Sequence, residues 1–237
     1  MSENLKVIRF AVIVCLVCSA LVSAAALGLR ERQEANLLLD IRKNILKSVS
    51  LYQPTLADEE VNRLFDERMV GLVLRPDGSV QEGRKPQDVD PDKEPDALLL
   101  YQCLDESGNV VAYTFPIQGQ GLWSTCYGYF ALEGDLDHVR GITFYKHGET
   151  PGLGGEIEQS WFQDQFVGKE VRDEKGEIVS VTVVKGSAAT QHASELEHYV
   201  DGISGATITS KAVSDMIKSS LQEYEPYFGQ IRQEVAS

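Results

Sequence analysis

The sequence is poor in positive charge. Its 237 residues include 22 lysines and arginines against 36 aspartates and glutamates, which gives a formal net charge of −14. Nucleic-acid binding depends on basic patches that neutralise phosphates, so this composition argues against that class of function. No Walker motif or Gly-x-Gly-x-x-Gly turn precedes a helical pattern, so we expect neither ATP nor NADH to bind this chain.

Cysteine and histidine are also scarce. Cys15 and Cys18 form a C-x-x-C, but both lie in an apolar run, where cysteine behaves as a small hydrophobic residue. Cys103 and Cys126 lie in strand-like segments and could form a disulfide in an oxidising compartment, although their spacing leaves this open. The four histidines lack the spacing of metal ligands, so no metal site is expected: His138, His147, His192 and His198.

Residues 10–29 contain no charged side chain. At about 1.5 Å per residue, a helix of this length spans about 30 Å, enough to cross the hydrocarbon core of a bilayer. The basic residues Lys6 and Arg9 before the run, and the small residues 23–26 within it, also fit a cleavable signal peptide. The length of the run favours a transmembrane helix over residues 10–29, preceded by a tail over residues 1–9. Basic residues lie on both sides, so charge does not fix the orientation.

Residues 30–96 read as a helical stalk, a small α/β segment and an acidic linker. Leu37, Ile41, Ile45 and Val49 recur at every fourth position, which predicts an amphipathic helix continuing from the apolar run. A second helix is expected over 58–68 and a strand over 70–74. Residues 81–96 are acidic and rich in proline, which indicates an exposed loop.

Residues 97–225 change to a strand pattern. Strands are predicted at 97–104, 109–115, 125–132, 139–145 and 178–184, with a short helix at 158–166 and a longer one at about 208–223. Because helices are missing between most strands, the pattern favours an α+β domain, with a mostly antiparallel sheet and flanking helices, over a doubly wound sheet. Residues 226–237 remain as a C-terminal tail.

The loop over residues 201–209, Asp-Gly-Ile-Ser-Gly-Ala-Thr-Ile-Thr, leads directly into the last helical pattern. Gly202 and Gly205 allow left-handed backbone angles, and free N–H groups at a helix start can hold a phosphate. Thr207 adds a hydroxyl at that point. Taken alone, the composition of the loop favours a simple capped helix entry, with Ser204 or Thr207 as the N-cap, because loops of small residues before helices are common.

The order of these residues resembles the flavinylation motif of bacterial membrane redox proteins. Two further segments, 119–124 and 149–155, are similar to other signatures of the same FMN-binding domain family. The resemblance implies an FMN whose phosphate is joined to the hydroxyl of Thr207 as a phosphoester. A separate transferase would make this bond, because no histidine lies beside Thr207 in the sequence to activate its hydroxyl. The positions that match the rest of the motif are Asp201, Ser204, Gly205 and Ala206. Asp201 is expected to cap the loop or to be read by the transferase, because its charge would be unfavourable beside the phosphate.

In the glycine-rich segment, the resemblance implies residues that wrap the flavin ring: Thr150, Gly152, Leu153 and Gly154. Taken alone this segment is a surface turn, and the glycines would serve by letting the backbone approach the ring closely. Trp123 is ambiguous between lining the flavin site and packing on the sheet, with a slight preference for packing.

With its apolar N-terminal run, the chain resembles the NqrC family, which are subunits of the Na+-translocating NADH:quinone reductases. The resemblance implies an electron carrier within a multi-subunit oxidoreductase of the bacterial inner membrane, crossing it once with the C-terminal domain in the periplasm. Its partners would be the other subunits, a flavin transferase and the membrane. Since residues 10–29 carry no charge, the chain is not expected to carry Na+ itself. The alternatives are the equivalent FMN subunit of an Rnf-type ion-translocating complex and a flavin-free anchored binding module.

Overall fold

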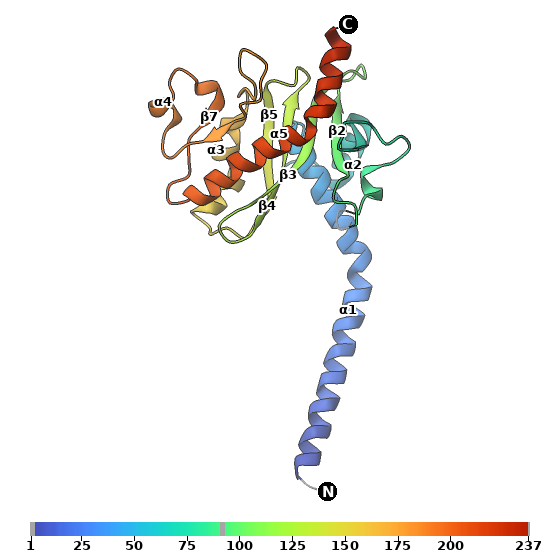
Figure 1. Cartoon of the computed structure of the whole chain (residues 1–237). Coiled ribbons are helices and arrows are strands. Elements are labelled where there is room, and N and C mark those ends of the chain that lie inside the picture. Colours follow the sequence, from blue (N-terminus) through green and yellow to red (C-terminus); the bar gives the residue numbers. More distant parts are fainter. Residues whose placement is uncertain (1–2, 91–92, 237) are drawn as a thin grey trace. The chain divides into compact units, whose positions relative to one another are not determined.

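The structure is a computed structural model that describes residues 3–90 and 93–236. The chain divides into two compact units between Ile41 and Arg42. Helix α1 (Glu3–Ser48) runs through this boundary, which confirms that the apolar helix continues beyond residue 29 (Figure 1). Of the predicted apolar stripe, Ile45 and Val49 are buried, whereas Leu37 is 61% exposed. Its N-terminal part is long and apolar enough to cross a membrane, a property that signal sequences share.

The second unit is built on one antiparallel sheet with the strand order β1-β2-β3-β4-β5. Helices flank this sheet, which confirms the predicted α+β class. Because β1 pairs with β2, the sheet begins before residue 97, where the sequence pattern placed the start of the domain. The strands are β1 (Met69–Leu74), β2 (Leu98–Leu104), β3 (Val110–Gln120), β4 (Thr125–Glu133) and β5 (Val139–Lys146).

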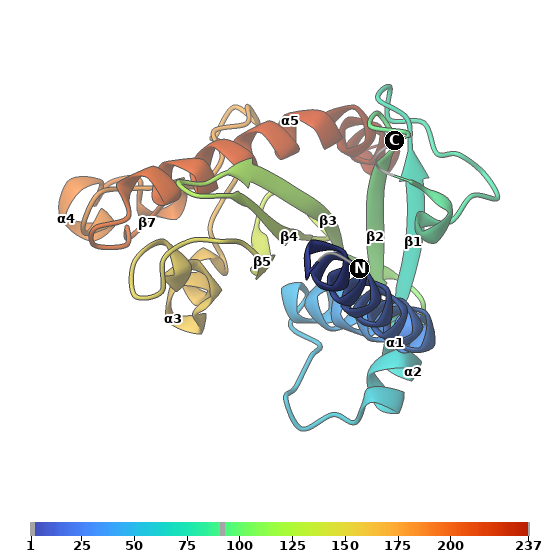
Figure 2. The same ribbon diagram turned by 90° about the horizontal axis from the view of Figure 1, so that it is seen from below.

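Helices cover both faces of the sheet. Figure 2 shows α5 (Thr207–Ala236) on one face and α2 (Asp58–Arg68) on the other. The last turns of α1 also pack in this unit, where Ile45 and Leu46 are fully buried. The Ser48 hydroxyl lies 2.8 Å from the Thr114 hydroxyl on β3, which ties the end of α1 to the sheet.

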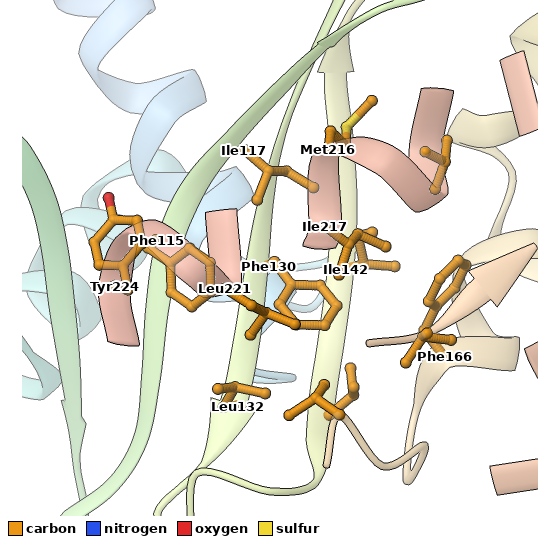
Figure 3. Close-up of a cluster of buried hydrophobic side chains, with 14 of the residues drawn as sticks. Phe115, Ile117, Phe130, Leu132, Ile142, Phe166, Met216, Ile217, Leu221 and Tyr224 are labelled. Carbon is orange, nitrogen blue, oxygen red and sulfur yellow. The ribbon is translucent and has the colours of Figure 1, made fainter. Parts of the chain in front are cut away.

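The main core lies between α5 and the sheet (Figure 3). Phe115 of β3 stacks on Tyr224 of α5 with ring centroids 4.4 Å apart. The helix continues through residues 226–236, most of the segment expected to be a tail, even though Pro226 lies inside it. Tyr227 and Phe228 are buried, so the spacing of three and four that starts earlier in α5 extends beyond the proline and holds it in the helix.

Residues 154–200 form short elements beside the sheet. The predicted helix over 158–166 is present as the turns α3 and η3, whereas the predicted strand over 178–184 is reduced to β6. Ser180 has a positive φ of 69°, outside the range of extended backbone, which ends the strand pattern there. Strand β6 pairs in parallel with β7. The bounds are η1 (Pro86–Asp88), η2 (Gly154–Glu158), α3 (Ser160–Gln163), η3 (Asp164–Phe166), β6 (Thr182–Val183), α4 (Ala188–Gln191), η4 (Leu196–His198) and β7 (Tyr199–Val200).

The two cysteines of the sheet unit are both buried and both free. Cys103 lies on β2 opposite Ala112, and Cys126 lies on β4 opposite Gly119. The disulfide that the sequence left open is therefore not formed in this structure.

Candidate functional site

Thr207 is the first residue of α5, and its side chain is exposed. In the turn before it Ser204 and Gly205 are exposed, Gly205 with a φ of 76°, and Ala206 is buried. Ser210 donates its N–H to the Ala206 carbonyl, and the three N–H groups before it in the helix have no hydrogen-bond partner among the described residues. Such N–H groups carry a positive partial charge, so the Thr207 hydroxyl lies where a phosphate would be stabilised.

Thr209 is the second threonine of the motif and is only 1% exposed. Two residues along an α-helix correspond to a rotation of about 200°, so Thr209 faces nearly the opposite side of α5 from Thr207. Its hydroxyl donates a hydrogen bond of 2.5 Å to the Glu149 carboxylate. Of the two threonines, only Thr207 presents an accessible hydroxyl.

Glu149 is the residue on which the segments of the site converge. Its Oε1 accepts the Trp123 N–H at 2.8 Å and the Ser124 N–H at 3.4 Å, and its Oε2 accepts the Leu122 N–H at 3.2 Å. Burial alone would raise the pKa of Glu149, but the hydrogen bonds from Thr209 and these N–H groups outweigh it and hold the pKa below the usual value. The carboxylate is therefore ionised at neutral pH.

Two glycines of the recognised motifs leave room for this carboxylate. A Cβ added to Gly121 would lie 2.6 Å from Glu149 Oε1. A Cβ added to Gly154 would lie 2.6 Å from Thr209 Oγ1 and 2.7 Å from Glu149 Oε2. The close approach expected at Gly154 is therefore made to the chain's own side chains.

Residues 150–153 of the glycine-rich loop are exposed, whereas Gly155 is buried like Gly154. Gly152 has a φ of 76°, and nothing lies within 4 Å of an added Cβ, so its conformation and not tight packing requires glycine. Leu153 is 43% exposed. Its Cδ2 lies 2.9 Å from the position that a Cβ would take if one were added to Gly205. Thr150 is exposed, and its carbonyl accepts the N–H groups of Leu153 and Gly155. Through Leu153, this loop lies against the turn that precedes Thr207.

Trp123 is 70% exposed and its neighbour Leu122 is 50% exposed. The preference for packing Trp123 on the sheet was therefore wrong, because the turn between β3 and β4 presents the indole to solvent. Leu122, Trp123 and Leu153 form what we call the apolar rim, three exposed side chains on the two loops joined by Glu149. Exposed apolar side chains grouped in this way commonly mark a binding surface.

A pocket of about 360 Å³ adjoins Thr207 between α5 and the segment over residues 179–185. Three lysines line it, Lys185, Lys211 and Lys218, and we call it the lysine pocket. The hydroxyl of Ser180, a buried residue of its lining, has no hydrogen-bond partner among the described residues. Asp215 is the one acidic residue of the lining, so with three lysines against it the pocket is a locally basic, hydroxyl-rich surface on an acidic protein.

The remaining candidates have structural partners. Asp201, the first residue of the motif, accepts the Ala188 N–H at 2.7 Å and so holds the start of α4 against the loop. His147 lies in the loop after β5 with a largely buried side chain, and its Nε2 is 2.9 Å from Glu158 Oε1. Within residues 3–90 and 93–236, no group of three or more His, Cys, Asp or Glu side chains could hold a metal ion.

Comparison with known families matches residues 121–222 to the FMN-binding domain. The chain is 37% identical to the NqrC subunit of the Na+-translocating NADH-quinone reductase of Pseudomonas aeruginosa, over 90% of this chain and 89% of that protein. The chain belongs to this NqrC family. The NqrC protein of Yersinia pestis is 34% identical over 96% of this chain and 93% of its own length.

Solved structures of NqrC proteins share the fold. The protein from Parabacteroides distasonis superposes with a TM-score of 0.72 at 32% identity, covering 84% of this chain and 96% of that one. Shewanella oneidensis NqrC gives a TM-score of 0.73 at 25% identity, covering 82% of this chain and 97% of that one.

Proposed function

We propose that this chain is the FMN-bearing subunit of a Na+-translocating NADH:quinone reductase, with the FMN phosphate joined to Thr207 as a phosphoester. As part of that oxidoreductase it is an electron carrier, and NADH oxidation and quinone reduction take place on other chains. Its similarity to NqrC proteins favours this complex over the Rnf-type alternative. The FMN-binding domain match favours it over a flavin-free binding module.

The observation that carries the attachment is the contrast between the two threonines of the motif. Thr207 has an exposed side chain at a helix start, whereas Thr209 is buried and bonded to Glu149. A threonine hydroxyl is a weak nucleophile without a base, so a flavin transferase must activate it. The exposed position of Thr207 gives such an enzyme access.

The residues around Thr207 fit both ends of FMN. The N–H groups that open α5 would stabilise the single negative charge of the phosphodiester, and the lysine pocket would add positive charge beside it. The apolar rim would contact the flavin ring, with Thr150 and Gly152 at its edge. Bound FMN supplies the uptake and release of electrons, and the protein sets its orientation and its potential.

The apolar part of α1 would be the anchor, crossing the inner membrane once with the sheet unit in the periplasm. Expected partners are the other subunits of the reductase, the flavin transferase during maturation, and the membrane itself.

The test is a pair of variants expressed with the transferase. Thr207→Ala should be folded but free of covalent flavin, whereas Thr209→Ala should keep a yellow colour that survives denaturation. Parent protein expressed without the transferase should be colourless. Covalent flavin retained in Thr207→Ala would refute the attachment site.

A further inference from the structure

Glu149 is a buried carboxylate that is held entirely by neutral donors. It is 5% exposed, and no cation contacts it among the ion pairs of the described residues. Removing an ionised carboxylate from water is costly, and here the Thr209 hydroxyl and three backbone N–H groups offset that cost. A neutral side chain could fill the space without that cost, which indicates that the charge serves a purpose beyond packing.

The donors come from two places far apart in the sequence. The N–H groups belong to the turn between β3 and β4, and the Thr209 hydroxyl lies in the first turn of α5. Glu149 itself begins the glycine-rich loop that carries Leu153. One carboxylate therefore connects the loop of Trp123, the loop of Leu153 and the helix start that bears Thr207.

The glycines around the carboxylate support the same arrangement. Gly121 lies in the β3–β4 turn and Gly154 in the glycine-rich loop, and a Cβ at either one would collide with Glu149. At Gly121 and Gly154, the backbone of each loop therefore lies directly against the Glu149 carboxylate, with no side chain in between.

We propose that Glu149 is a positioning residue for the flavin, whose carboxylate and the Thr209 hydroxyl hold the apolar rim against the ring attached at Thr207. This rests on the function proposed above. Without the carboxylate, the loop of Trp123 loses its shared acceptor and moves away from the start of α5. Here the closed loop is the one held at Glu149, and the open loop is the one that has moved away. Loss of a charged hydrogen-bond partner should shift the equilibrium between these two positions towards the open loop by about tenfold or more.

The fluorescence of the flavin tests this proposal, because an indole quenches that fluorescence only when it is in contact with the flavin ring. The full-length flavinylated protein would be compared with Glu149→Gln, which removes the charge, and Thr209→Val, which keeps the charge and removes its hydroxyl donor. Trp123→Phe gives the emission without quenching. Glu156→Gln is the matched control, since Glu156 directly follows the glycine-rich segment and its carboxylate accepts a hydrogen bond only from the Trp161 indole among the described residues.

Both Glu149→Gln and Thr209→Val should retain covalent FMN, and their emission should rise towards that of Trp123→Phe, together with a shifted midpoint potential. Glu156→Gln should match the parent. Parent-like emission and potential in folded, flavinylated Glu149→Gln would overturn the proposal, and so would a Trp123→Phe variant no brighter than the parent. If Glu149→Gln does not fold, Thr209→Val decides by the same criteria. Absence of flavin from Thr207 of the parent would instead refute the proposed function, which keeps the two failures distinct.

Discussion

The two sides of the start of α5 differ in chemistry. On the side of Thr209, a buried carboxylate draws two loops together and leaves an apolar rim exposed. On the side of Thr207, lysines and hydroxyls line an open pocket. A flavin nucleotide has the same division, with a largely apolar ring and a charged, hydroxyl-bearing tail. With the attachment proposed above, the helix start would serve both ends of one ligand, with the phosphate at Thr207 and the ring at the apolar rim.

The largest effect on this arrangement should come from Gly154→Ala. Its Cβ would enter the space between Thr209 and Glu149, so overpacking and a lost hydrogen bond should together cost about 3 kcal/mol of unfolding free energy. Gly152→Ala, where space is open and only the left-handed backbone is unfavourable, should cost about 1 kcal/mol. Urea unfolding of both variants measures the difference.

The same pair distinguishes the roles of the two glycines. Gly154→Ala should also change the flavin emission, and Gly152→Ala should leave it close to that of the parent. Equal losses of stability in the two variants would show that Gly154 is not packed as the structure describes.

An intermediate effect should appear in the pH dependence of stability. Because the folded-state pKa of Glu149 is lowered, its contribution to stability is present above the ordinary glutamate pKa and is lost as the pH falls through the folded value. At neutral pH, Glu149→Gln should be less stable than the parent by about 2 kcal/mol. That gap should close as the pH falls below about 4. A gap that stays constant from neutral to acid pH would show that the charge of Glu149 does not contribute.

The smallest effect should come from the lysine pocket. Lys211→Ala removes an exposed charge near Thr207, worth about 0.5 kcal/mol at low salt and less at high salt. The flavin midpoint potential should therefore shift slightly at low ionic strength, and the shift should fade as salt is added. Lys175→Ala, in a turn outside the pocket, is the control. Equal shifts in both variants would remove the lysine pocket from the account.

Much of the sheet could be predicted from local patterns. The strands around Cys103, Tyr129 and Ile142 follow alternation that a single segment reveals, and they lie where the pattern placed them. The continuation of α5 was missed because its cause is tertiary. Phe228 packs against Phe115 and Tyr113 of β3, and the Tyr227 hydroxyl accepts a hydrogen bond from Gln102 of β2. These contacts keep Pro226 within the helix.

The residues of the site could be predicted from sequence motifs, but the hydrogen bonds that join its segments could not. Thr207 could be chosen from the order of residues around it, and the structure adds its exposure. The role of Glu149 could not be read from the sequence, because its partners lie about 25 residues before it and 60 residues after it. Its place at the head of the glycine-rich motif was the available signal. The exposure of Trp123 depends on how the β3–β4 turn is held, which is again set by Glu149.

The most direct test of the account is to locate the flavin on the mature protein. Trypsin should release residues 186–211 as one peptide that contains both Thr207 and Thr209. Fragmentation mass spectrometry between these two residues should place the FMN phosphate on Thr207. Flavin on Thr209, or on a residue outside 201–209, would contradict the account.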